Sequence, residues 1–259
     1  MRAEALAYES QAYQSQAYQN QEVQIAAAAS ETAGSEGRGS SWRYLKGTQT
    51  ESNNIQNQLN SSNIQSVLYN AARGNKESFK SLDRKKTGII HIATHGFFLN
   101  DIEKNYAEME RLERMGGGKK AFENPLMKSG LILAGGNNAW SGNPVPGVEN
   151  GILFADDVAR MNLLGAELVV LSACETGLGD VKNGEGVFGL QRAFKLAGAE
   201  TLIMSLWIVS DQASKDMMIE FYKNWLSGEN KQEAFKEAQK LIRGQYQHPY
   251  FWAAFVLMD

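Results

Sequence analysis

The chain has a single cysteine, Cys174, and only four prolines among its 259 residues. One cysteine excludes an internal disulfide and is typical of a protein from a reducing compartment. Long apolar runs are missing too: no segment approaches the roughly 18 uninterrupted apolar residues of a membrane span, and the N-terminus lacks the apolar core of a signal peptide. We therefore expect a cytoplasmic protein that does not bind membranes.

A strong excess of charge and the usual metal or nucleotide motifs are also absent. The formal net charge is −3, which gives no electrostatic footprint for nucleic acid. No group of His, Cys and acidic residues has metal-ligand spacing, and no Walker A sequence occurs. Residues 184–189 match G-x-G-x-x-G, but they do not follow a predicted strand immediately, as a dinucleotide fingerprint requires. We expect no metal and no cofactor.

Composition divides the chain near residue 41. The first part repeats Gln-Ala-Tyr-Gln at residues 11–14 and 16–19 and ends in a Gly-, Ser- and Glu-rich stretch at 31–41. Such sequence is typical of a flexible linker, so we expect residues 1–41 to form a low-complexity tether. Residues 42–259 have a globular composition and are expected to form one domain.

In the globular part, strands alternate with helices. Apolar runs predict strands at 89–96, 129–134, 168–174, 201–207 and 251–258, and two of them, 89–96 and 168–174, have the continuous character of parallel strands buried on both faces. Helical periodicity predicts one or two helices at 50–82 and further helices at 155–163, 186–197, 212–226 and 231–243. The pattern indicates an α/β fold, a mostly parallel sheet with helices on both faces.

Two of the predicted strands end in residues whose side chains can act in catalysis. One ends at Cys174, and the other ends at His95, which Gly96 follows. Because parallel strands bring their C-terminal ends to one edge, we expect the thiol and the imidazole to meet there as nucleophile and base. The backbone N–H groups of Gly96 and Cys174 would form an oxyanion hole. A lone cysteine is more often a buried structural residue, so from these residues alone both interpretations stay open.

Ordered blocks of sequence also carry a resemblance to a known family. From about residue 44 to the end, and most strongly from 89, the chain resembles the CHAT family, caspase-like proteases of the caspase–separase–gingipain group of cysteine peptidases. The matching blocks are HIATHG (91–96), SGLILAG (129–135), GILFADDV (151–158), LVVLSACETGLG (168–179), GEGV (184–187), AGA (197–199), SLW (205–207) and HPYFWAAF (248–255).

The resemblance implies a three-layer caspase–haemoglobinase fold and a cysteine endopeptidase that cleaves a protein substrate through a thioester intermediate. In the family pattern His95 matches the catalytic histidine, Cys174 the nucleophile, and Gly96 the residue whose N–H completes the oxyanion hole. The resemblance further carries substrate contacts to Ser172, Trp207 and Asp211. Many relatives are bacterial effector proteases controlled by attached repeat or sensor domains, so it implies such a regulatory partner.

Two departures from the family pattern affect these expectations. The family domain usually begins with further strands and helices, whereas a low-complexity tether stands there in this chain, so we expect an incomplete N-terminal part. The stretch 207–211 has Ile208 and Ser210 where the family often shows proline and an acid, which leaves the P1 preference open.

Alternatives stay open for the function and for single residues. The chain could be an inactive module that docks a partner protein, or a thiol hydrolase or acyltransferase with the same dyad. Asp211 could cap the following helix or act as a pocket acid. A switch or processing cut is expected in segments 103–120 or 137–150. Structural roles are expected for His91 in the core, His248, Glu175 in its loop, and Asp156 and Asp157 near a helix start.

Overall fold

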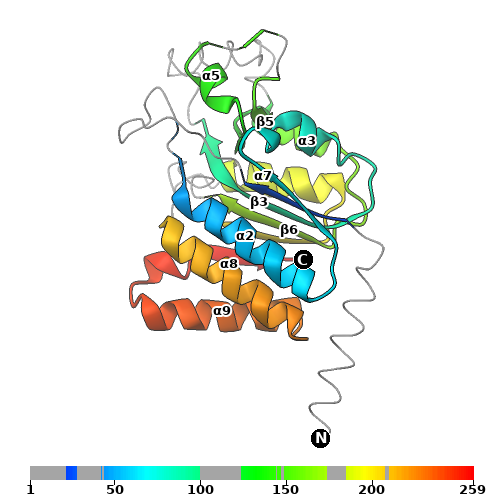
Figure 1. Ribbon diagram of the computed structural model, residues 1–259. Coiled ribbons are helices and arrows are strands. Elements are labelled where there is room, and N and C mark those ends of the chain that lie inside the picture. Colours follow the sequence, from blue (N-terminus) through cyan, green and yellow to red (C-terminus); the bar gives the residue numbers. More distant parts are fainter. Residues whose placement is uncertain are drawn as a thin grey trace, which may run out of the picture.

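The computed structural model describes residues 22–27, 42, 44–99, 124–143, 145–146, 149–173, 185–207 and 210–259. In these ranges the chain forms one mixed sheet with helices on both faces (Figure 1). None of the helices in the described ranges is both long and apolar enough to cross a bilayer.

The sheet has a mainly parallel path with antiparallel additions. Its strands follow the order β2 (Ser66–Asn70), β1 (Glu22–Ala27), β3 (Thr87–Phe98), β6 (Leu168–Ala173), β7 (Thr201–Ser205) and β8 (Phe255–Met258). The first five strands pair in parallel, while β8 is antiparallel to β7. Beyond the parallel part of β3, β4 (Ser129–Ile132) pairs antiparallel with it and with β5 (Ile152–Phe154). The predicted α/β class is confirmed, and the predicted mostly parallel sheet is confirmed in part.

The central strands are buried on both faces because their side chains alternate between two apolar layers. Leu168 and Val170 point into the layer under α2 (Lys46–Ser61), α8 (Asp211–Leu226) and α9 (Lys231–Gln245). Val169 and Leu171 point into the layer under α3 (Lys76–Lys80), α6 (Ala155–Ala159) and α7 (Glu185–Ala197). This alternation has the period of two that a strand imposes. Figure 1 shows α2, α8 and α9 together on one side and α3 and α7 on the other.

Residues 22–27 contradict the expectation of a tether over 1–41. They form β1, which lies inside the sheet between β2 and β3 and is parallel to both. In the sequence, the β-branched Val23 and Ile25 alternate with Glu22 and Gln24, which is a strand pattern, and the repetitive surroundings concealed it. Residues 1–21 and 28–41 lie outside the described residues.

Several predicted boundaries were wrong. The region 50–82 holds α2, then strand β2, the short helix η1 (Ala71–Arg73) and α3, because Val67 and Leu68 belong to a strand and not to a helix face. The loop expected at 137–150 begins inside α5 (Gly136–Trp140), whose N-cap Gly135 has a φ of 87°. The helix expected at 155–163 ends at Ala159. The last predicted strand begins only at Phe255, after η5 (Pro249–Phe251).

Candidate functional site

The candidate site begins where β3 changes its pairing. Up to Thr94 the strand is in parallel register with β6, and its last pair joins Thr94 to Ala173. From the next residue on, β3 runs antiparallel to β4, with His95 opposite Ile132 and Gly96 opposite Leu131. The rim of the parallel sheet therefore lies at His95. Cys174 follows Ala173 in the sequence and lies outside the described residues.

An aromatic ring lies against this part of the rim. His95 is 9% exposed, and the centroid of its imidazole lies 5.1 Å from the ring centroid of Trp42. The hydroxyl of Thr94, one residue earlier, donates a hydrogen bond to the backbone carbonyl of Ile132. This bond ties the end of the parallel segment of β3 to β4, so the backbone on both sides of His95 is held by neighbouring strands.

Beneath the rim, a buried polar network joins β3 and β6. Nε2 of His91 lies 2.9 Å from one carboxylate oxygen of Glu51, and Nδ1 lies 3.3 Å from the hydroxyl of Tyr222. The hydroxyl of Ser172 donates to the other oxygen of Glu51, at 3.1 Å. All four side chains are at most 3% exposed. The network therefore fastens α2 and α8 to the two strands that lead to His95 and Cys174.

This network confirms one expectation and bears on another. His91 is a hydrogen-bonded core residue, as predicted, and is too deeply buried to serve as a second base. Ser172, expected to contact substrate, is buried with its hydroxyl directed at Glu51.

Asp211 connects the far side of the rim to α2. It is the first residue of α8, but Ser210 is the N-cap, because the Ser210 hydroxyl accepts the backbone N–H of Ala213. Of the two alternatives for Asp211, the cap of its own helix is therefore ruled out. One of its carboxylate oxygens instead accepts the backbone N–H of Gly47, 2.5 Å away in the first turn of α2. That N–H has no partner within its own helix turn, so the aspartate caps α2 from a neighbouring helix.

Trp207 lies at the end of β7 and is partly buried. Its indole Nε1–H donates to the carbonyl of Tyr250, 3.0 Å away, and its ring packs against the core layer under α2 and α8. The ring is therefore fixed in place, with part of its surface exposed. Residues 208–209, between Trp207 and α8, lie outside the described residues.

Comparison with known proteins identifies the family. The family model described as CHAT domain matches residues 3–259, nearly the whole chain. The chain belongs to the CHAT domain family.

Two similar proteins share part of this CHAT domain. Mouse tetratricopeptide repeat protein 28 is 31% identical over 146 residues, which are 55% of this chain and 6% of that protein. Its human counterpart is 32% identical over 144 residues, 54% of this chain and 6% of that protein. The match therefore spans a small fraction of the length of these relatives.

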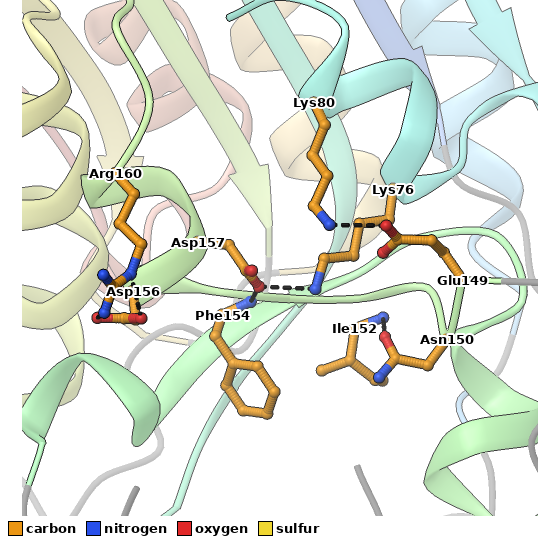
Figure 2. Close-up of polar contacts among 9 residues, drawn as sticks. All are labelled: Lys76, Lys80, Glu149, Asn150, Ile152, Phe154, Asp156, Asp157 and Arg160. Carbon is orange, nitrogen blue, oxygen red and sulfur yellow. Dashed lines mark hydrogen bonds and ion pairs between the residues drawn. The ribbon is translucent and has the colours of Figure 1, made fainter. Parts of the chain in front are cut away.

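Polar residues elsewhere in the CHAT domain have the structural roles expected of them. The Asp157 carboxylate accepts the backbone N–H of Phe154 at the start of α6 and pairs with Lys76, whose Nζ lies 2.7 Å away (Figure 2). Asp156 pairs with Arg160 one turn later, and the hydrogen bond from that guanidinium is the main cause of a lowered pKa of Asp156. His248 caps η5 through the backbone N–H of Tyr250.

Sequence reasoning missed Glu51, although a signal was present. Glu51, Ile55 and Leu59 are spaced by four residues and share one face of α2, and all three are buried. An acid on the apolar stripe of a helix requires a partner in the core, and His91 was the available one. Segment 103–120 and Glu175, singled out above, lie outside the described residues, as do parts of 137–150. The described residues contain no group of three or more His, Cys, Asp and Glu arranged to hold a metal ion.

Proposed function

We propose that this CHAT domain is a cysteine endopeptidase in which Cys174 is the nucleophile and His95 the base. The observation that carries the proposal is the register of β3 and β6, which pairs Thr94 with Ala173. Adjacent strands lie about 4.8 Å apart. His95 follows Thr94 and Cys174 follows Ala173 in the sequence. This supports an encounter of imidazole and thiol at the rim, where α/β sheets bind their ligands.

The proposed reaction proceeds in two halves. His95 takes the proton of the Cys174 thiol, and the thiolate attacks the carbonyl carbon of the scissile peptide bond. The N–H groups of Gly96 and Cys174 hold the oxyanion, and the amine product leaves with the proton that His95 returns to it. A water molecule, deprotonated by His95, then hydrolyses the thioester, which releases the acid product and restores the thiol.

For the substrate contacts, the surroundings favour two of the three residues expected. Trp207 and Asp211 keep partly exposed side chains on either side of residues 208–209, so we assign them to the wall of the substrate channel. Ser172 is buried and bonded to Glu51, so we assign it to the positioning of β6.

The cellular context of the proposed enzyme follows from its relatives and its composition. The relatives are named as tetratricopeptide repeat proteins, and the match covers 6% of their length, so we propose that a repeat segment or repeat protein regulates this domain. The single cysteine fits a reducing cytoplasm, in which the thiol stays available for catalysis.

The test is proteolysis of a peptide library by the purified protein and by Cys174→Ala and His95→Ala variants. We expect cleavage by the wild type and a loss of turnover of at least about 100-fold in each variant, because positioned acid–base help is typically worth about 10²–10⁴-fold. His248→Ala is the matched control, since His248 caps η5 and takes no part in the proposed chemistry. Wild-type turnover in the Cys174→Ala variant would refute the proposal.

A second candidate is a docking module without catalysis. The names of the two relatives, which refer to repeats and to no peptidase, favour it. The two functions differ in the reactivity of Cys174. An activated thiol should react with iodoacetamide near neutral pH faster than a model thiol, whose pKa is about 8.5, whereas slow labelling would favour the docking module.

A further inference from the structure

Trp42 lies against the candidate base although it belongs to no helix or strand. Its ring centroid is 5.1 Å from that of His95, with the two planes inclined by 38°, and 5.0 Å from that of Trp140 in an edge contact. Trp140 in turn contacts Phe97, which lies two residues beyond His95 on β3. The imidazole is thus the last ring of a continuous aromatic row.

The backbone of Trp42 is held by the side chain of Asn137 of α5. The Trp42 N–H donates to the Asn137 carbonyl oxygen at 2.6 Å, and the Asn137 amide donates back to the Trp42 carbonyl at 2.9 Å. An amide side chain can match both backbone groups of one residue in this way, as a neighbouring strand would. Two bonds to one residue restrict both its position and its rotation.

The helix that carries Asn137 is itself held closely. A Cβ on Gly151 would overlap the backbone of Gly135 and Gly136, at the start of α5, so only glycine permits this approach to β5. The chain of contacts therefore runs from β5 through α5 and Asn137 to Trp42, and ends at the imidazole of His95.

We propose that Trp42, held by Asn137, is a positioning residue for His95. Resting on the proposed function, this assigns the indole two tasks. It fixes the plane of the imidazole, and its π-face stabilises the imidazolium that forms when Cys174 loses its proton. A base held in a single orientation is in place when substrate arrives, so the residue acts on turnover and not on substrate affinity.

The contact itself is tested by NMR of the histidine side chains, which number three in this chain. In Trp42→Leu and Asn137→Leu we expect the ring-proton shifts of His95, assigned with His95→Gln, to lose their ring-current contribution, and in Trp42→Phe to retain most of it. His91 is the internal control, because its neighbour is Tyr222, at 5.6 Å, and its signals should not move. Unchanged His95 shifts in both leucine variants would overturn the proposal. The Asn137→Leu variant makes this a test of the position of Trp42, because its indole is intact.

Turnover tests the positioning. We expect kcat in Trp42→Leu and Asn137→Leu to fall by about tenfold with KM within about twofold, and Trp42→Phe to recover most of the loss. Trp252→Leu is the control, because this ring packs against Arg243 of α9, and it should leave both constants unchanged. A rise in KM alone would make Trp42 a substrate contact and overturn the proposal, as would wild-type kcat in both leucine variants. Full activity of Cys174→Ala would instead show that the proposed peptidase chemistry had failed, whatever the NMR shifts.

Discussion

His91 and His95 lie four residues apart on β3, and their surroundings differ in almost every respect. His91 is fully buried between α2 and α8, with a carboxylate on one ring nitrogen and a phenol on the other. His95 lies where the strand exchanges a parallel neighbour for an antiparallel one, beside the indole of Trp42. One histidine therefore fastens layers of the fold together, while the other is held at a rim. The position of each histidine along β3 therefore decides which role it takes.

Exchanging each histidine for glutamine separates the two roles, with the largest effect expected on activity. His95→Gln should lower kcat/KM by about 10²–10⁴-fold, because the base is lost, and leave the free energy of unfolding nearly unchanged. His91→Gln should do the reverse, with weaker stability and most of the activity kept in the molecules that remain folded. Peptide cleavage and urea unfolding of both variants check this. If both variants lost activity equally and kept the same free energy of unfolding, the two histidines would not have separate roles.

Removing Glu51 tests the buried side alone. In Glu51→Ala, the His91 ring and the Ser172 hydroxyl both lose the carboxylate that binds them in the core. Each buried polar group left unsatisfied costs about 1–3 kcal/mol, so the free energy of unfolding should fall by several kcal/mol in a urea titration. Glu51→Gln, which keeps the shape and one acceptor, is the control and should lose less. If Glu51→Ala lowered the free energy of unfolding no more than Glu237→Ala, which removes an exposed glutamate, the network would not stabilise the fold.

A smaller effect is expected at the link between the rim and α2. A methyl group on Gly47 would overlap the Asp211 carboxylate, so Gly47→Ala should displace this cap and cost about 1 kcal/mol. Gly244→Ala in α9 is the matched control, because its Cβ would meet nothing within 4 Å and the change should stabilise the helix by about 0.5–1 kcal/mol. Thermal unfolding of the pair gives the signs, and a stabilising Gly47→Ala would contradict the assigned cap.

The smallest effect is expected at the surface pair of Asp156 and Arg160. The pKa of Asp156 is lowered in the folded chain, chiefly by the Arg160 hydrogen bond and further by Asn124. A carboxyl with a lowered pKa stabilises the fold above its unfolded pKa of about 3.9, and this contribution is lost as the pH falls through the folded value. Asp156→Asn should therefore be slightly less stable than wild type at pH 7, with the difference vanishing in acid. Urea midpoints between pH 7 and pH 2 check this, and a difference that does not depend on pH would contradict it.

Much of the second half of the fold could be predicted from the sequence, because its elements have strong local patterns. The apolar runs of β6 and β7 and the amphipathic faces of α7, α8 and α9 each specify their own structure. The strands β1 and β2 are as long as β6 and β7, but they were missed because they lack such apolar runs and their pairing joins distant parts of the chain. The local sequence around Val23 or Val67 does not show with which strand each of these segments pairs.

Part of the candidate site was predictable, while Cys174 lies outside the described residues. His95 and Gly96 were expected at the end of a strand, whereas β3 continues to Phe98 and changes its pairing partner at His95. Trp42 was beyond prediction, because no local pattern connects an isolated tryptophan to a histidine 53 positions later (95 − 42). The amide of Asn137, brought near by α5, holds Trp42 beside His95.

The carboxylate of Glu51 touches β3 and β6 at once, and this has a consequence for how the chain assembles. Sliding one strand past the other by a single residue would turn His91 or Ser172 toward the opposite layer and leave one buried oxygen of Glu51 without that partner. A wrong register between β3 and β6 therefore costs free energy in the core, even when no substrate is bound. Through Glu51, α2 thus favours the register of β3 and β6 on which the proposed dyad depends.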